Sequence, residues 1–500
     1  MTRVETELRY ASGPGRWVLA ATVLGSAIVA IDATVVGIAL PAIGRDFGTG
    51  MATLQWVVSA YTLTLAGLLL VAGSLGDRYG RRRVFVIGVV WFALASVLCG
   101  IAPSAGMLIA ARALQGVGGA LLTPGSLAIL EASFVPEDRG KAIGAWSGLG
   151  GVATAIGPFL GGWLVQAASW RLIFAINIPI AVVVVALAVR HVPESRDPQA
   201  TGRVDVTGGA LVTLGLVGLT YGLIEGPTLG FGDPVVLAAL VGGVALLAGF
   251  ALWESRTAHP MLPLDLFASR QFTFTNVVTF VVYGALGGAL FLLPIMLQQV
   301  SGYTALEAGI SLLPLTVIML ALSARSGALA ARIGPRLQMS VGPILVGLGF
   351  ALFVRVGHGG SYLTEVLPAV LVLGLGLAAT VAPLTATVLA AAPARHAGMA
   401  SAVNNDVARA AGLIAVAVLP AAAGITGSAY LHPDEFAHGF RIAALISAAL
   451  CVLGGLVAAV TIRNPRPVTV VPVAAPKSCA HCGLDAPPAR ATEAAQVPVS

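Results

Sequence analysis

The chain alternates long apolar stretches with short polar segments along most of its length. A hydropathy window of about 19 residues finds fourteen stretches long enough to cross a bilayer as α-helices. Their predicted bounds are 17–41, 53–75, 84–102, 106–130, 142–166, 171–189, 206–224, 235–253, 273–296, 306–328, 338–356, 365–390, 398–422 and 440–461. The pattern therefore predicts an all-α integral membrane protein with fourteen transmembrane helices.

Composition supports this fold class and narrows the functions. Of 500 residues, 57% are hydrophobic and 10% are charged, against about 25% charged in a soluble domain. The net charge of +6 comes from basic residues spread one loop at a time, so the expected partner is a lipid bilayer and not a nucleic acid. No phosphate-binding loop and no loop large enough for a catalytic domain is visible. We expect neither ATP-driven transport nor an enzyme.

The distribution of lysine and arginine predicts the orientation of the helices. The side that carries both ends of the chain takes 21 of these residues, the opposite side takes four, and three fall within spans. Basic loops accumulate on the cytoplasmic side. We therefore expect a multi-pass protein of the plasma (inner) membrane with both termini in the cytoplasm. The first span is expected to act as an uncleaved targeting signal.

A short loop between the second and third spans combines one acid with four arginines. Its glycines allow a tight turn, and its acid can pair with the arginines. The pattern resembles the signature Gly-x-Leu-x-Asp-Arg-x-Gly-Arg-Arg/Lys of the major facilitator superfamily and matches it at every position. The resemblance implies a gate loop that closes the cytoplasmic side of the protein in its outward-open state. Its residues are Gly73, Asp77, Arg78, Gly80, Arg81 and Arg82.

A weak internal repeat predicts the domain organisation. Residues 327–336 echo the gate loop eight spans later, with Ala331 in the place of Asp77. This offset predicts two six-helix halves with an inserted pair of helices, 6+2+6. The resemblance implies that these halves are the two pseudo-symmetric bundles of the major facilitator fold. The expected segments are a cytoplasmic tail (1–16), the N-terminal bundle (17–190), linkers with two inserted helices (191–271), the C-terminal bundle (272–462) and a disordered cytoplasmic tail (463–500).

An acidic residue, Asp32, lies in the middle of the first span. A carboxylate inside a span costs about 2.5–3.5 kcal/mol, so it is rarely kept for packing alone. Hydrocarbon favours the neutral form of a carboxyl group, which makes a proton available for exchange. The stretch Ile31–Pro41 resembles the acidic motif of the 14-spanner drug/proton antiporters, with Gly37 where that family usually has Asn. The alternative is permanent pairing with a buried arginine.

Such an arginine, Arg112, lies in the fourth span. The stretch from Arg112 to Gly116 matches the superfamily pattern Arg-x-x-Gln-Gly, and the resemblance links this arginine to proton coupling. A rise of 1.5 Å per residue places Asp32 about 14 Å and Arg112 about 9 Å below the outer boundary. The two side chains can pair, either as a static salt bridge or only in part of a transport cycle.

Small residues concentrate in the fifth span around one proline. Gly157, Pro158, Gly161 and Gly162 resemble the motif associated with antiporters, although Ala153 stands where that family often has Gly. Closely spaced glycines let helices approach, and the proline bends the helix. The motif therefore predicts either a hinge or ordinary tight packing.

The remaining polar residues give weaker predictions. Asp406 and Arg409 lie three apart in the thirteenth span and are expected to neutralise each other; alternatively, Asp406 is a second site for a proton or cation. Cys479 and Cys482 lack a second ligand cluster, so no metal and no cofactor is predicted. Polar residues within spans are candidates for the substrate cavity: Tyr61, Gln115, Asn276, Tyr283, Gln298 and Asn405.

The resemblance implies a function. It predicts a proton-coupled secondary active exporter, an antiporter of hydrophobic or cationic drugs that works by alternating access. Its partners would be a small-molecule substrate and protons, and we expect a monomer. One alternative is a dedicated exporter of a single metabolite or self-made antibiotic. Another, of a different class, is a non-transporting membrane sensor or scaffold that uses the C-terminal tail.

Overall fold

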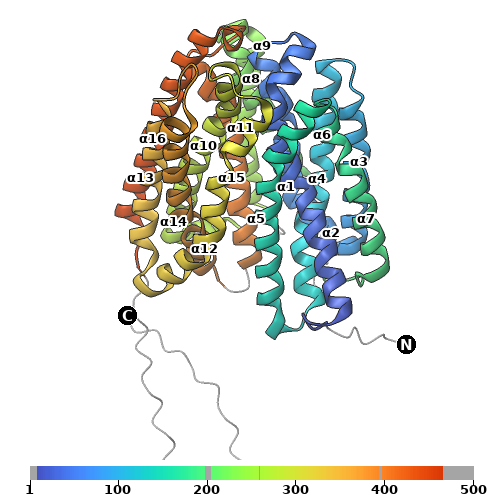
Figure 1. Cartoon of the computed structure of the whole chain (residues 1–500). Helices are drawn as coiled ribbons and strands as arrows, with labels where there is room; N and C mark the ends of the chain where they lie inside the picture. The colour runs from blue at the N-terminus through green and yellow to red at the C-terminus, as the bar shows by residue number, and fades with distance from the viewer. Residues whose placement is uncertain (1–7, 198–203, 258–259, 394–396, 465–500) are drawn as a thin grey trace, which may run out of the picture. The chain divides into compact units, whose positions relative to one another are not determined.

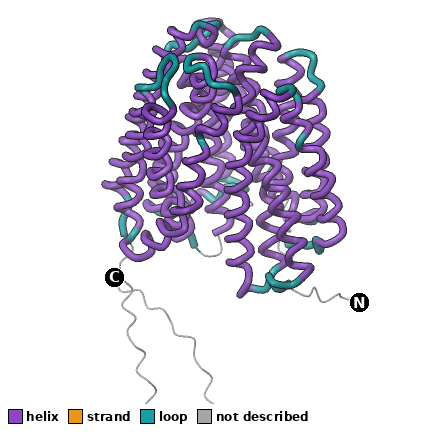
Figure 2. Tube along the Cα trace, viewed as in Figure 1, coloured by secondary structure: helices purple, strands orange, loops and turns teal. Residues whose placement is uncertain are grey.

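The computed structural model describes residues 8–197, 204–257, 260–393 and 397–464. Within these ranges it contains fourteen helical spans long and apolar enough to cross a membrane. Apart from one bridge between Leu8 and Phe134, the regular structure of the described residues is helical (Figure 2). The prediction of an all-α membrane protein with fourteen spans is confirmed.

The helices run in the order drawn in Figure 1. Their bounds are α1 Gly13–Phe47, α2 Met51–Tyr79, α3 Arg81–Gly100, α4 Ala105–Ser133, α5 Pro136–Ala167, α6 Leu172–Ala175, α7 Asn177–His191, α8 Val206–Leu229, α9 Pro234–Glu254, η1 Leu264–Ala268, α10 Arg270–Gln299, α11 Ala305–Ser311, α12 Leu313–Ile333, α13 Pro335–Phe353, η2 Tyr362–Val366, α14 Leu367–Ala391, α15 Ala397–Ala422, η4 Ala429–Leu431 and α16 Pro433–Thr461.

Several helices extend beyond the predicted apolar spans because their ends are capped by polar residues. Helix α1 begins after Ser12, whose hydroxyl accepts a hydrogen bond from Gly15 N at 3.1 Å. It ends at Gly48, which has a φ of 59° and so takes the left-handed conformation that glycine favours. Helix α5 begins at Pro136 and has two acids in its first turn, where negative charges interact favourably with the positive end of the helix dipole. Hydropathy alone misses such polar turns.

Two of the predicted spans are interrupted. The sixth is divided into α6 and α7 around Ile176, and the tenth into α11 and α12 around Leu312. Pro179 and Pro314 lie just after these breaks, and a proline removes a backbone donor and crowds the preceding turn. The first interruption matters most for function, because α7 then begins at a polar residue, Asn177.

The helices pack in two sets with a repeated pattern. In the first set, α1 packs on α4, α5 and α7, while α4 also packs on α2 and α3. In the second set, α10 packs on α14, α15 and α16, while α14 also packs on α12 and α13. Two six-helix repeats would give this pattern. The segment bounds drawn from the sequence stay a prediction.

Helices α8 and α9 lie between the two sets in the sequence and pack mainly on each other. Helix α8 also contacts α2 and α15, one helix from each set. Gly67 of α2 makes room for Thr213 of α8, because a Cβ at residue 67 would lie 3.0 Å from the Thr213 Cβ. Glu225 of α8 accepts a hydrogen bond from the Trp56 indole at 2.8 Å.

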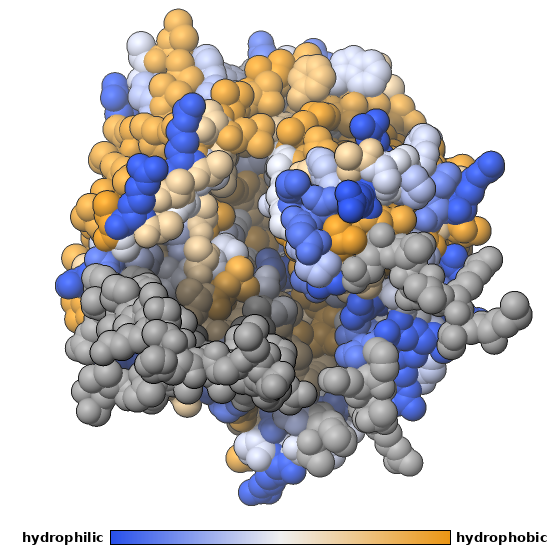
Figure 3. Space-filling view, turned by 90° about the horizontal axis from the view of Figure 1, so that it is seen from below, coloured by the Kyte–Doolittle hydropathy of each residue, from blue (hydrophilic) through white to orange (hydrophobic). Residues whose placement is uncertain are grey.

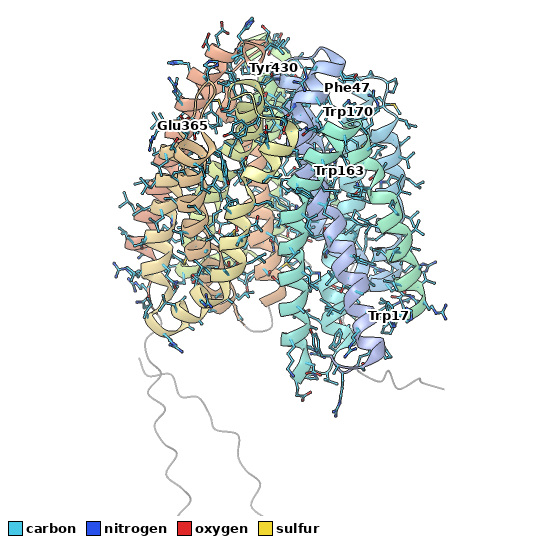
Figure 4. All side chains as sticks on the ribbon, viewed as in Figure 1. Trp17, Phe47, Trp163, Trp170, Glu365 and Tyr430 are labelled. Atoms are coloured by element: carbon cyan, nitrogen blue, oxygen red, sulfur yellow. The ribbon has the colours of Figure 1, made fainter. Side chains whose placement is uncertain are left out.

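The two ends of the bundle differ. We call the end at which α1 begins and α2 meets α3 the basic end, and the opposite one the far end. Trp17 lies at the basic end, whereas Phe47, Trp170 and Tyr430 lie at the far end (Figure 4).

Hydrogen bonds between the two sets lie at the far end in the part of the chain that the structure describes. They join Gln55 Nε2 to Val416 O at 2.7 Å, Gln298 Nε2 to Ile38 O at 2.9 Å, Met51 N to Gly427 O at 3.0 Å, and the Tyr430 hydroxyl to Thr49 O. At the basic end, Figure 3 shows a deep hollow near the centre of the molecular surface. The structure is therefore closed at the far end and open at the basic end.

Candidate functional site

The acid in α1 lies at the centre of a buried polar cluster. Asp32 and Arg112 are each 1% exposed, and Arg112 NH1 lies 2.5 Å from Asp32 Oδ2. The other carboxylate oxygen, Oδ1, accepts hydrogen bonds from Gln115 Nε2 at 2.8 Å and from Asn177 Nδ2 at 3.2 Å. The two charged residues that the sequence placed at similar depths are thus paired in this state. Their role in proton coupling stays a prediction.

Arg112 is held from several sides. Its Nε donates to Val57 O at 3.1 Å, and its NH1 also donates to Gln115 Oε1 at 2.6 Å. The guanidinium carbon lies 4.3 Å from the centre of the Tyr61 ring, a cation–π distance. A buried ion pair is tolerated when further hydrogen bonds satisfy both charges, as they do here.

The helix that carries Arg112 approaches its neighbours closely because of its glycines. Gly116 lies against the backbone of Tyr61 in α2, and a Cβ at Gly118 would lie 2.6 Å from the Phe92 nitrogen in α3. Arg112 and Gln115 are three residues apart in α4, so they share one helical face. This packing brings both side chains to Asp32.

Two members of the cluster were missed in the sequence. Ser96 of α3 accepts from Gln115 Nε2 at 2.9 Å and from Asn177 Nδ2 at 3.2 Å, and donates to Phe92 O at 2.8 Å. Asn177 is fully buried. The available signal for Asn177 was an amide two residues before a proline within an apolar span, where a helix break turns polar groups inward.

The gate loop lies at the basic end and is bound by the segment that follows α7. Arg81 pairs with Asp77 at 2.8 Å, while Arg82 lies 3.7 Å from the Glu194 carboxylate. Gly80 has a φ of 116°, and a Cβ there would lie 2.7 Å from Glu194 Oε1, so glycine suits this turn. Glu194 is a further residue that the sequence analysis missed. The gating role of the loop remains untested.

The small residues of α5 contact helices of both sets. Gly157 and Gly161 face α1, and a Cβ at Gly161 would lie 3.0 Å from Val35. Gly162 faces α11, where a Cβ would lie 2.7 Å from the Leu306 Cα. Pro158 lies against Gly309 of α11. Both expected consequences, a hinge and tight packing, are compatible with this arrangement.

The expected ion pair in α15 is not formed among the described residues. No ion pair joins Asp406 to Arg409, and Asp406 Oδ1 is buried without a hydrogen-bond partner. Local spacing on one helix predicted the pair, but spacing alone does not fix the rotamers that a direct contact requires. The alternative role of Asp406 stays a prediction.

The candidates for the substrate cavity occupy different surroundings. Gln115 belongs to the Asp32 cluster, and Asn276 is buried between α10 and α15, where it accepts from Asn404 Nδ2 at 3.0 Å. Tyr61 is 3% exposed, and its buried hydroxyl has no partner. Tyr283 is half-buried, and Asn405 is exposed. Contact with a substrate stays a prediction for all of them.

Metal binding finds no support in the part of the chain that the structure describes, where no group of three or more His, Cys, Asp or Glu residues is suitably placed. Cys479 and Cys482 lie outside the described residues.

Comparison with known proteins identifies the family. A sequence profile described as Major Facilitator Superfamily matches residues 22–417. The chain belongs to the major facilitator superfamily. It is therefore a multi-pass membrane protein of a transporter family, and the Asp32 cluster lies within the residues that the family profile matches.

Relatives of this facilitator chain include resistance and export proteins. It is 36% identical to the tetracenomycin C resistance and export protein of Streptomyces glaucescens over 80% of this chain and 74% of that protein. It is 36% identical to the puromycin resistance protein pur8 of Streptomyces alboniger over 92% and 94%. The multidrug resistance protein Stp of Mycobacterium tuberculosis is also 36% identical, over 83% and 77%.

Solved structures share the facilitator fold. A bacterial homologue of the human lysosomal transporter Spinster, in an inward-facing and unoccupied conformation, aligns with a TM-score of 0.64 and 17% identity. The alignment covers 90% of this chain and 97% of that one. The peptide transporter POT in complex with sulfate aligns with a TM-score of 0.65 and 14% identity, over 91% and 96%.

Proposed function

We propose that this protein is a proton-coupled antiporter that exports hydrophobic or cationic small molecules by alternating access. The observation that carries the proposal is the Asp32 carboxylate, 1% exposed and paired with Arg112 inside a transmembrane bundle. A buried ion pair contributes little net stability compared with apolar residues of the same size. An acid retained in this position is better explained by the binding and release of a proton.

The pairing of Asp32 suggests one half of a cycle. Arg112 at 2.5 Å and the two amide donors suit an ionised Asp32 carboxylate, and the hollow at the basic end is open. A proton on Asp32 removes the attraction to Arg112 and leaves a positive charge that favours rearrangement. Substrate would enter from the basic end in the deprotonated state, and the proton would enter from the far end after the bundles rearrange.

The orientation follows from the distribution of basic residues. We place the basic end in the cytoplasm of the cell, with both termini on that side, and the protein in the plasma (inner) membrane. The open hollow of this structure then faces the cytoplasm, as an exporter needs for loading. We expect a monomer to be sufficient, because the polar cluster lies within one set of helices.

The other motifs receive roles within this cycle. Asp77, Arg78, Arg81 and Arg82 would form the gate that closes the cytoplasmic side in the outward-open state. The glycines of α5 would form the contact about which the two sets move at the far end. Asp406, whose Oδ1 is buried without a hydrogen-bond partner, is a candidate site for a second proton or for the positive charge of a substrate.

A single-substrate exporter is a second candidate. Two of the relatives are named for resistance to one antibiotic, whereas a third is named for multidrug resistance. A panel of substrates separates the two possibilities. Export of chemically unrelated hydrophobic cations favours the broad range, and export of one compound favours the narrow one.

The proposal is tested with the full chain in proteoliposomes that carry an imposed pH difference and are incubated with a fluorescent lipophilic cation in the outer solution. Proton-driven accumulation of the cation against its gradient is the expected result, and Asp32→Asn should abolish it. Asp233→Asn is the control, because Asp233 caps α9 at 2.8 Å from Val235 N and asparagine is an equally good cap. Accumulation that ignores the pH difference would overturn the proposal.

A further inference from the structure

The groups around Asp32 match an ionised carboxylate. Arg112 NH1, Gln115 Nε2 and Asn177 Nδ2 each direct an N–H group at one of its oxygens, at 2.5, 2.8 and 3.2 Å. A protonated carboxyl group carries an O–H that requires an acceptor. Arginine has no acceptor, and both acceptor positions of Gln115 Oε1 are taken, by Arg112 NH1 at 2.6 Å and by the Cys99 thiol at 3.6 Å. In this arrangement the proton has no partner.

One acceptor among the side chains bonded to Asp32 is free. Asn177 Oδ1 is buried and has no hydrogen-bond partner. Its amide nitrogen lies 3.2 Å from both Asp32 Oδ1 and Ser96 Oγ. Rotation of the amide by half a turn exchanges its nitrogen and oxygen, and then directs an acceptor toward Asp32.

The surroundings permit this rotation. The present orientation is held only through the amide nitrogen, and turning the amide breaks no hydrogen bond at the oxygen, which has no partner. The Ser96 hydroxyl, which donates to Phe92 O at 2.8 Å, can turn to donate to the amide oxygen instead. Gln115 differs, since turning its amide breaks the hydrogen bond that its oxygen accepts from Arg112.

We infer that Asn177 is a positioning residue whose amide donates to ionised Asp32 and turns over to accept a hydrogen bond from protonated Asp32. The inference rests on the proposed function, in which Asp32 binds the transported proton. The helix break supports it, because α7 begins at Asn177 with Pro179 two residues later. Asn177 thereby lets one buried site hold both forms of the acid.

Infrared difference spectra between acidic and alkaline pH test the rotation in the reconstituted full chain. The expected spectrum contains a protonated carboxyl band, which is lost in Asp32→Asn. It also contains an amide carbonyl band that moves when asparagine is labelled with ¹³C and that disappears in Asn177→Leu. The wild-type labelling experiment gives an answer even if the Asn177 variant does not fold.

Transport provides the second measurement. Leucine is close to asparagine in size but has no polar group, so Asn177→Leu removes one hydrogen bond from each form of Asp32. The bond to the charged form is the stronger, and the pH of half-maximal transport should rise by about one unit. Asn404→Leu, which removes a buried amide between α10 and α15, should leave this pH unchanged.

The outcomes separate the inference from the proposed function. A carboxyl band that titrates without an asparagine band, or an Asn177→Leu variant with the wild-type pH profile, overturns the role of Asn177 and leaves proton coupling intact. A spectrum without any Asp32 carboxyl band overturns the proposed function, and the inference with it.

Discussion

At Asp32 and Arg112, two opposite charges are kept out of water by the packing of four helices. Hydrogen bonds stabilise both partners of the pair: the Gln115 and Asn177 amides donate to Asp32, and Arg112 Nε donates to Val57 O. Removing either charge alone should destabilise the fold, because the remaining buried charge has lost its hydration and no longer has a partner of opposite sign.

The stability of single and double variants should show this dependence. Arg112→Leu leaves Asp32 unpaired and should lower the free energy of unfolding by about 3–5 kcal/mol. The double variant Asp32→Asn with Arg112→Leu should lose less, because no charge remains buried. Thermal unfolding in detergent at neutral pH gives the order of the midpoints. A double variant that is less stable than Arg112→Leu alone would contradict this account.

At the scale of helices and loops, some predictions depended only on the hydropathy that the bilayer requires, and others depended on how neighbouring helices pack. The fourteen spans followed from hydropathy because hydrocarbon accepts only helices whose backbone is satisfied internally. The pairing of Asp32 with Arg112 followed from depth alone. Asn177 and Ser96 did not, because the direction of a small polar side chain depends on the neighbouring helices. For the same reason, the local spacing of Asp406 and Arg409 predicted a direct ion pair that the described residues do not form in this state.

The contact between α5 and α11 gives a prediction about motion. A Cβ at Gly309 would lie 2.8 Å from the carbonyl carbon of Pro158, so Gly309→Val should force the two helices apart at the far end. Export should fall at least tenfold while the amount of protein in the membrane stays similar. Gly148→Val is the control, because a Cβ there meets nothing within 4 Å. Equal loss of export in both variants would remove the special role of this contact.

The gate loop gives a second prediction for an element. In this open state Asp77 pairs with Arg81 one turn later, a local contact at the end of the helix, so Asp77→Asn should not disturb insertion. If the loop closes the cytoplasmic side in the other state, the loss of this charge should slow turnover by an order of magnitude or more. Initial export rates per inserted molecule measure the effect. A rate equal to that of the wild type would refute the gating role.

For the whole molecule, hydrogen bonds between the two sets of helices at the far end favour the state that is open at the basic end. Gln55 and Gln298 each donate across the two sets at the far end, to Val416 O and Ile38 O. A hydrogen bond contributes about 0.5–1.5 kcal/mol net, so two of them contribute roughly as much as a tenfold change in population. The equilibrium between the two open states should therefore respond to their removal.

Spin labels at the basic end can follow that equilibrium. Val189 of α7 and Leu337 of α13 are both exposed and lie in different sets of helices, so labels there report the separation of the sets. The double variant Gln55→Leu with Gln298→Leu weakens closure at the far end and should increase the population with a shorter distance between the labels. Gln338→Leu is the matched control, because Gln338 donates to Ser326 within one set, at 2.9 Å. Both changes remove hydrogen-bonded glutamine side chains. An identical shift in the two proteins would therefore mean that general loosening of the bundle, and not the contact between the sets, determines which end is open.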